Sequence, residues 1–158
     1  MDILNNEFLL FLSCASKTNL KYLLVGGFAV NFHGYSRNTK DMDVWLQPTK
    51  ENQNIFIKTI LCMKYTEEEV ALFYEEDFTQ PFKATIGPYD SSLDFLTFFH
   101  PALNFDEAFE KKETVEIEED VFASFVSYDF LIDMKLKSKR EKDLWDVARL
   151  DEIRNLNK

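Results

Sequence analysis

The residues whose types and spacing bear most directly on chemistry are the acidic pair Asp41 and Asp43. They lie one residue apart at the start of an expected strand over residues 42–46. Alternate residues of a strand point to the same face, so two such carboxylates repel each other unless a cation lies between them. Because hard oxygen ligands suit Mg²⁺ or Mn²⁺, the pair predicts a divalent-metal site. The alternative interpretation is a solvated acidic turn.

Asp94 and a glycine pair strengthen the metal hypothesis. Asp94 lies inside the apolar segment 93–98, where a lone carboxylate is costly to bury without a partner. A strand placed beside residues 42–46 would bring Asp94 to the same metal. Gly26 and Gly27 follow the apolar run 22–25 and precede an expected helix, so backbone amides there can approach a phosphate.

Several other site classes are excluded by the sequence. It contains no GxxxxGK[ST] loop and no GxGxxG, HExxH or GxSxG motif. The two histidines, His33 and His100, leave few options for a Ser-His-Asp hydrolase. We expect His33 to be a packing or capping residue, because no partner lies at ligand spacing.

The hydrophobic pattern predicts one mixed α/β domain spanning residues 1–158, with a short mixed sheet flanked by helices and a helical C-terminal tail at about 127–157. Strands are expected at 22–25, 42–46, 82–86, 93–98, 115–117 and 121–126. The first helix is expected to bury Phe8, Phe11, Leu12 and Ala15, with Asn5 or Asn6 as its N-cap. The pattern Thr66-Glu67-Glu68-Glu69 predicts a capping box.

Composition restricts the partners and the compartment. The chain has 158 residues, with 18 Lys or Arg against 28 Asp or Glu, a net charge of −10. Such acidity argues against broad binding to duplex DNA. No apolar stretch approaches the roughly 18 residues that span a bilayer, so we expect no membrane partner and a cytoplasmic protein. Cys14 and Cys62 are expected to be reduced thiols.

A resemblance to a known superfamily unites these motifs. The order of an apolar strand, two glycines, thirteen further residues, an Asp-x-Asp pair and a later acidic strand resembles the nucleotidyltransferases with the DNA polymerase β-like fold. In this chain it is carried, over about residues 20–98, by Leu23-Leu24-Val25-Gly26-Gly27, Asp41-Met42-Asp43-Val44 and Leu93-Asp94-Phe95. Many members carry Ser beside the glycines, where this chain has Gly27 and Phe28.

The finer pattern is similar to the small prokaryotic branch, which includes minimal nucleotidyltransferases and the toxins of abortive-infection toxin–antitoxin pairs. It consists of Gly26-Gly27-Phe28-Ala29-Val30, His33-Gly34, Arg37-x-Thr39-x-Asp41 and, in the tail, Lys135, Ser138, Arg140 and Lys142-Asp143. The resemblance implies transfer of a nucleoside monophosphate from a nucleoside triphosphate to a hydroxyl of RNA, protein or a small molecule. It also implies an antitoxin or toxin as a possible partner.

The resemblance assigns roles to individual residues. Catalysis and binding of Mg²⁺ or Mn²⁺ are expected of Asp41, Asp43 and Asp94. Nucleotide binding is expected of Gly26, Gly27, Arg37, Lys135 and Lys142. Simpler alternatives stay open: Arg37 and the basic tail as solvated surface, and Asp143 and Asp146 as salt-bridge partners of neighbouring basic residues.

Competing functions are also open. A catalytically inactive nucleotidyltransferase-like binding module, such as a toxin–antitoxin component, would keep the fold without the reaction. A DxD sugar-nucleotide transferase is possible, although 158 residues is short for one. A dehalogenase-like phosphatase is rejected, because polar residues 36–40 precede the aspartate pair where that chemistry needs an apolar strand. Asp94 is the discriminating residue, since only the polymerase β-like interpretation uses it.

Overall fold

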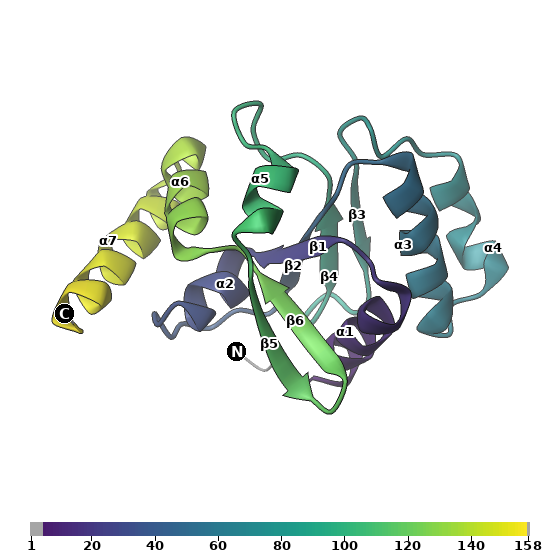
Figure 1. The fold of residues 1–158 in the computed structure, drawn as a ribbon, viewed down its shortest axis with the longest axis horizontal. Helices are drawn as coiled ribbons and strands as arrows, with labels where there is room; N and C mark the ends of the chain where they lie inside the picture. Colours follow the sequence, from purple (N-terminus) through teal and green to yellow (C-terminus); the bar gives the residue numbers. More distant parts are fainter. Residues whose placement is uncertain (1–4, 158) are drawn as a thin grey trace.

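A mixed sheet forms the centre of the fold in a computed structural model that describes residues 5–157 (Figure 1). Within these residues the sheet has six strands in the spatial order β3-β4-β2-β1-β6-β5. The strands are β1 (Tyr22–Val25), β2 (Met42–Leu46), β3 (Lys83–Ile86), β4 (Leu93–Leu96), β5 (Glu113–Glu118) and β6 (Val121–Phe125). β1 pairs antiparallel with β2 and parallel with β6, and β2 pairs parallel with β4. The predicted mixed α/β class is therefore confirmed.

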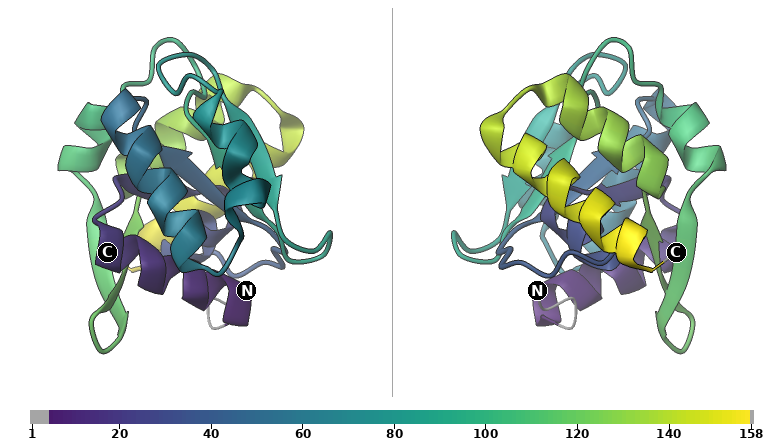
Figure 2. Two further views of the ribbon diagram at one scale, coloured as in Figure 1. Left: turned by 90° about the vertical axis from the view of Figure 1, so that its right-hand side faces the viewer. Right: turned by 90° about the vertical axis from the view of Figure 1, so that its left-hand side faces the viewer.

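Helices flank this sheet. They are α1 (Asn6–Thr18), α2 (Gly26–Phe32), α3 (Lys50–Cys62), α4 (Glu67–Val70), the 3₁₀ turn η1 (Ala71–Tyr74), α5 (Phe105–Glu110), α6 (Tyr128–Ser138) and α7 (Glu141–Leu156). α1 packs against α3 and β6, and α2 packs against β1, β2 and α6. The α6–α7 pair lies at the opposite end of the molecule from α3 and α4 (Figures 1 and 2). No helix within the described residues is long and apolar enough to cross a membrane.

Side-chain caps fix where the helices begin. Asn5 accepts a hydrogen bond from the amide of Glu7 at 3.0 Å, as expected for the N-cap of α1. At α4 the predicted capping box forms, because Thr66 and Glu69 each bond the other's backbone amide. Such caps satisfy amides that have no partner within the helix, so these local predictions are confirmed.

The core is built largely from phenylalanine rings. The predicted buried face of α1, consisting of Phe8, Phe11, Leu12 and Ala15, is buried. The ring of Phe95 on β4 lies 5.4 Å from that of Phe11 and 4.9 Å from that of Phe56 on α3. Through this one side chain, β4, the strand that carries Asp94, is fastened to both α1 and α3. The expected strand 93–98 ends earlier, at Leu96, and Phe98 and the following Phe99 are 41% and 42% exposed.

The C-terminal tail is helical, as predicted, and consists of two helices. It breaks into α6 and α7 at Lys139, whose φ of 57° lies in the left-handed region. The hydroxyl of Ser138 bonds the carbonyl of Lys135 at 2.9 Å and the carboxylate of Asp143, which stabilises the turn. The break lets α7 return beside α6, as the right-hand view in Figure 2 shows.

The two cysteines also differ from expectation. Cys14 on α1 and Cys62 on α3 form a disulfide, so the expectation of reduced thiols is wrong. The two residues are 48 positions apart, and they meet because α1 packs along α3. Sequence spacing alone carries no sign of that helix contact.

Asn52, in the first turn of α3, ties this helix to two strands. Its Oδ1 accepts from the amide of Lys21 at 3.0 Å, and its Nδ2 donates to the carbonyls of Lys21 at 2.9 Å and Gln47 at 3.2 Å. The side chain is 1% exposed. Asn52 therefore holds the residue before β1 beside the residue after β2, which supports the pairing of these two strands.

We expect Asn52→Ala to lower the free energy of unfolding by about 2–4 kcal/mol, because several buried backbone groups lose their partners at once. Urea denaturation measures the change. The matched control is Asn54→Ala, an exposed position on the same helix, which is expected to change stability by less than about 0.5 kcal/mol. Equal stability of the two variants would contradict the anchoring role of Asn52.

Candidate functional site

Two of the expected carboxylates lie side by side on neighbouring strands. β2 lies between β1 and β4, and the register places Val25, Asp43 and Asp94 in one row across the three strands. The prediction that the strand of Asp94 lies beside residues 42–46 is therefore confirmed. The pairing is parallel, so both strands bring their acidic residues to the same end of the sheet.

Ser92 links Asp94 to Asp41. Its amide and its hydroxyl donate to Oδ1 of Asp41 at 3.3 and 3.0 Å, and the hydroxyl also lies 3.1 Å from Oδ1 of Asp94. A hydroxyl carries one proton, so it serves the two carboxylates alternately. Sequence analysis missed Ser92, although its position two residues before Asp94 placed it on the same side of the chain.

Burial and neighbouring negative charge both act on the carboxyl group of Asp43. Burial, followed by the charges of Asp94 and Asp41, raises the pKa of Asp43 to about 6, against the opposing charges of Lys135 and Lys142. A carboxylate in these surroundings favours a nearby cation.

Gly26 gives the carboxylate of Asp43 its space. It has a φ of +63°, in the left-handed region, and a Cβ built there would lie 2.9 Å from Cγ of Asp43 and would overlap its Oδ2. A side chain at this position is therefore excluded twice, by backbone strain and by the carboxylate. We call Gly26 and Gly27 the glycine turn, and Asp43 and Asp94 the acidic row. The two are packed directly against each other where Gly26 meets Asp43.

The segment between α2 and β2 is fastened to the glycine turn by Asn31. Its Nδ2 donates to the carbonyls of Gly27 at 2.8 Å and Arg37 at 3.0 Å, and its Oδ1 accepts from the amide of Arg37 at 3.0 Å. Asn31 was not singled out from the sequence. A side-chain amide that bonds backbone groups four residues before it and six residues after it leaves no periodic signal.

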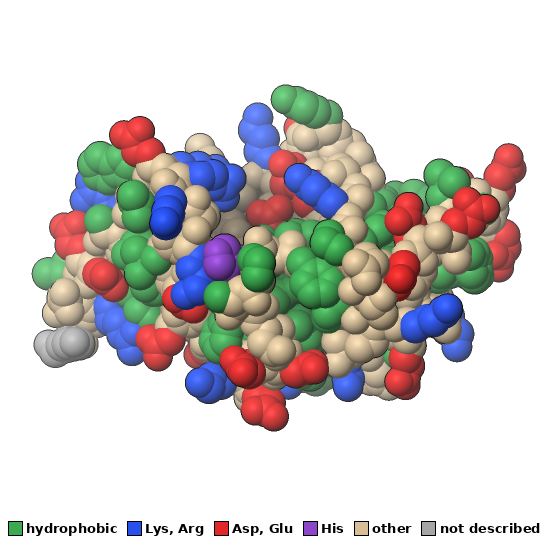
Figure 3. Space-filling model, turned by 90° about the horizontal axis from the view of Figure 1, so that it is seen from above, with side chains coloured by type: hydrophobic (Ala, Val, Ile, Leu, Met, Phe, Trp, Pro, Cys, Tyr) green, Lys and Arg blue, Asp and Glu red, His purple; other side chains and the backbone are tan. Residues whose placement is uncertain are grey.

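An open cleft of about 370 Å³ adjoins these elements. Its lining includes Gly26, Gly27, Thr39, Asp41, Asp43 and Asp143, together with the cationic residues Arg37, Lys40, Lys135, Arg140 and Lys142. Most of the expected site residues therefore meet in one place, and Asp94 lies next to Asp43. Figure 3 shows Lys and Arg side chains gathered over the α6–α7 end, beside a hollow in the surface.

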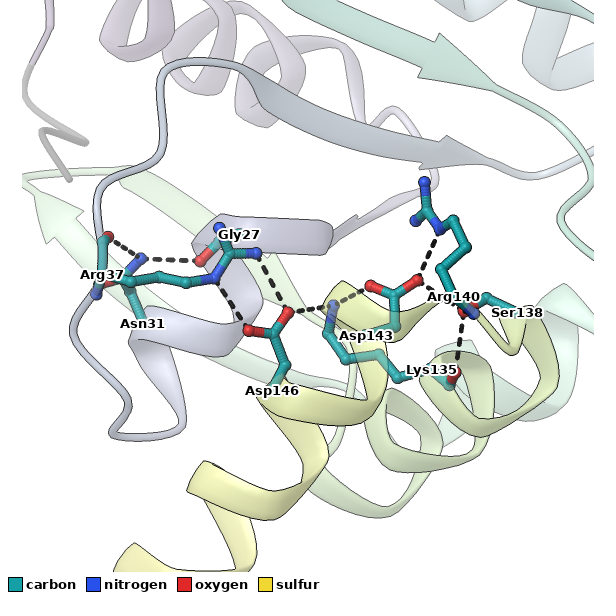
Figure 4. Close-up of polar contacts among 8 residues, drawn as sticks. All are labelled: Gly27, Asn31, Arg37, Lys135, Ser138, Arg140, Asp143 and Asp146. Carbon is teal, nitrogen blue, oxygen red and sulfur yellow. Dashed lines mark hydrogen bonds and ion pairs between the residues drawn. The ribbon is translucent and has the colours of Figure 1, made fainter.

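Two of the expected nucleotide-binding cations are already paired within the chain (Figure 4). The ammonium of Lys135 lies 3.0 Å from Oδ1 of Asp143 and 2.9 Å from Oδ2 of Asp146. Asp146 also receives Arg37, whose Nη2 donates to Oδ2 at 3.2 Å. The salt bridges considered for Asp143 and Asp146 are thus confirmed. An ammonium has three protons, so these two carboxylates leave one proton of Lys135 without an assigned partner.

Asp143 is the anionic centre of the α6–α7 turn. Burial raises its pKa, but hydrogen bonds from Ser138, Lys135 and Arg140 together with the charge of Lys135 outweigh this effect and lower the pKa to about 2. Asp143 is therefore ionised at neutral pH and holds Lys135 and Arg140 at the edge of the cleft.

The donor set suits a hard divalent cation. Asp41, Asp43 and Asp94 supply carboxylate oxygens, and burial together with the charges of Asp94 and Asp41 raises the pKa of Asp43. Within residues 5–157, no three carboxylate, imidazole or thiolate groups are gathered closely enough to form a ready-made metal site. The metal therefore remains a prediction.

His33 plays the structural part expected of it. Its Nε2 lies 2.8 Å from the carbonyl oxygen of Val126, and the residue caps the C-terminal end of α2.

No protein-family description matches this chain, and no curated protein matches it at a significant level.

The raised pKa of Asp43 predicts a pH-dependent effect on stability without metal. The carboxyl binds its proton more tightly in the folded than in the unfolded chain, so its contribution to stability is complete below about pH 4 and is lost as the pH rises through about 6. We expect Asp43→Asn to raise the free energy of unfolding by about 2 kcal/mol at pH 7.5 and by less than about 1 kcal/mol at pH 4. Urea denaturation in EDTA at both pH values measures this.

Asp77 provides a control of opposite sign. Hydrogen bonds from Thr79 lower the pKa of Asp77, so Asp77→Asn should remove stability at neutral pH. If Asp43→Asn proved destabilising at pH 7.5, the crowding of charge in the acidic row would be contradicted.

Proposed function

We propose that this protein is a metal-dependent nucleotidyltransferase with a polymerase β-like fold. The observation that carries the proposal is the row in which Asp43 and Asp94 lie side by side on parallel strands, with Asp41 linked through Ser92. A glycine turn and a cationic cleft adjoin this row. The carboxylates are needed to bind metal ions, and the cationic cleft is needed to bind the phosphates of a polyanionic substrate.

Asp41, Asp43 and Asp94 would hold Mg²⁺ or Mn²⁺ in this proposal. A bound divalent ion supplies Lewis-acid stabilisation of charge on phosphate oxygens. The chain itself supplies a fixed set of carboxylates, because strand pairing holds Asp43 and Asp94 and because Ser92 restrains Asp41 and Asp94. Partial burial of Asp43 lessens the screening of its charge by water.

The cationic side of the cleft would bind the triphosphate of a ribonucleoside triphosphate. Lys40 and Lys142 have exposed side chains at the cleft, whereas Lys135 is held by Asp143 and Asp146. Lys142 also lowers the pKa of Asp43, so the positive charge of its ammonium reaches the acidic row. These features suit a ligand that contacts the lysines of the cleft at one end and the carboxylate site at the other.

The proposed reaction is an in-line substitution at phosphorus. An oxygen of the acceptor hydroxyl forms a bond to the α-phosphorus, the bond from that phosphorus to the bridging oxygen of the β-phosphate breaks, and pyrophosphate leaves. The hydroxyl proton passes to a carboxylate, for which Asp94 is the candidate, and then to solvent. The chain contributes by positioning and by electrostatics rather than by a covalent intermediate.

The sequence resemblance extends this proposal to an acceptor on RNA, protein or a small molecule, and to an antitoxin or toxin partner. A second candidate function is nucleotide or protein binding without catalysis. The observation that favours it is the pairing of Arg37 and Lys135 with Asp146, because both cations are already neutralised within the chain.

Calorimetric titration with ATP, GTP, CTP and UTP, each with and without Mg²⁺, tests the proposal. We expect at least one nucleotide to bind in a metal-dependent manner and the Asp41→Asn/Asp43→Asn variant to lose that dependence. Acceptor extracts are then added, and release of pyrophosphate is measured. Release supports the nucleotidyltransferase, whereas binding without release supports the binding module. Absence of binding with either Mg²⁺ or Mn²⁺ would overturn the proposal.

We expect Lys142→Ala to weaken nucleotide binding about tenfold, because a hydrogen bond to a charged group contributes about 1.5–3 kcal/mol. Lys139→Ala is the matched control, since Lys139 lies in the nearby α6–α7 turn but does not line the cleft. Equal losses from both variants would indicate a general effect of charge, and would contradict a specific role of Lys142.

A further inference from the structure

The side chain of Thr39 covers Gly27. A Cβ built on Gly27 would lie 2.7 Å from Cβ of Thr39 and would overlap its Oγ1. The hydroxyl of Thr39 therefore fills the space that a side chain at position 27 would take. Gly27 is absent from the positive-φ glycines, so its backbone would accept any residue. Its lack of a side chain is explained by Thr39 rather than by conformation.

The chain fixes this arrangement from two sides. Asn31 binds the carbonyl of Gly27 and both backbone groups of Arg37, which positions the segment that continues to Thr39. On the other side, Asp41 directly precedes β2 and accepts hydrogen bonds from Ser92. Thr39 is thus placed between the glycine turn and the acidic row.

The hydroxyl of Thr39 has only a weak partner. Its contact to the carbonyl of Asp41 is 3.4 Å long, near the limit for a hydrogen bond. A charged oxygen is a stronger acceptor than a carbonyl at that distance. Thr39 also lines the cleft together with Arg37, Lys40 and Lys142. A polyanion bound by these cations would therefore lie near the hydroxyl of Thr39.

We propose that the hydroxyl of Thr39 donates a hydrogen bond to a phosphate oxygen of the nucleoside triphosphate in this cleft. The inference rests on the proposed function and adds a binding residue to it. It assigns Thr39 to the phosphates and not to the base, so its contribution is the same for every nucleotide and for inorganic tripolyphosphate.

Thr39→Val and Thr39→Ser test the assignment. Valine keeps the shape that packs on Gly27 and removes the hydroxyl, whereas serine keeps the hydroxyl. By calorimetry with Mg²⁺, we expect the Kd to rise about tenfold in Thr39→Val for the tightest-binding nucleotide and for tripolyphosphate. Thr39→Ser should stay within about twofold of the wild type, and thermal melting should show both variants folded.

Relocating the hydroxyl gives an independent test. Gly27→Ser alone should lower the melting temperature and weaken binding, because its side chain meets Thr39. In Gly27→Ser/Thr39→Ala the obstacle is gone, and binding should be tighter than in Thr39→Ala alone. A double variant that binds no better than Thr39→Ala would count against a phosphate-contacting hydroxyl at this place.

The outcomes separate the two proposals. Wild-type protein that binds neither nucleotides nor tripolyphosphate with Mg²⁺ or Mn²⁺ overturns the proposed function and this inference with it. Metal-dependent binding by the wild type that Thr39→Val retains within twofold overturns this inference alone.

Discussion

The pairing of β2 with both β1 and β4 is the constraint on which the site depends. It aligns Val25, Asp43 and Asp94 across three strands, and Gly26 follows Val25 directly. Strand pairing thereby brings two carboxylates together at the end of the sheet where the chain turns at Gly26. The apolar residues of the same strands are buried, so the sheet cannot slip without exposing its core. Repulsion between the carboxylates is thus imposed by hydrophobic packing.

A buried network of ion pairs around Lys135 lies beside the acidic row. Lys135 is 6% exposed and lies between Asp143 and Asp146, each 3% exposed. Buried charges of this kind are stable only when paired, so the network specifies how α7 lies against α6 and against Arg37. Within residues 5–157 no ion pair holds Asp41, Asp43 or Asp94, although the charges of Lys135 and Lys142 lower the pKa of Asp43. This contrast is why the row is the better candidate for binding an external cation.

Local signals in the sequence were sufficient for many elements. Capping residues such as Thr66 and the helical spacing from Phe8 to Ala15 act within one element, and both predictions are confirmed. Asp94 was identified because a carboxylate in an apolar strand needs a partner. The metal, the nucleotide and the roles of these residues stay predictions.

Other features depend on contacts between distant segments and could not be derived from spacing. Ser92 and Asp41 meet only through the pairing of β2 with β4, and Cys14 and Cys62 meet only through the packing of α1 on α3. The division of the tail into α6 and α7 depends on the left-handed turn at Lys139, a residue with no intrinsic preference for it. Long-range packing decides each of these cases.

Above all, we propose that the row of Asp43 and Asp94 binds a divalent cation. Anomalous diffraction from crystals of the protein soaked in Mn²⁺ and a non-hydrolysable nucleoside triphosphate tests it most directly. We expect a manganese peak between the carboxylates of Asp43 and Asp94, and its loss in Asp43→Asn crystals. Density for manganese only at other surface carboxylates, or a peak that Asp43→Asn retains, would contradict it.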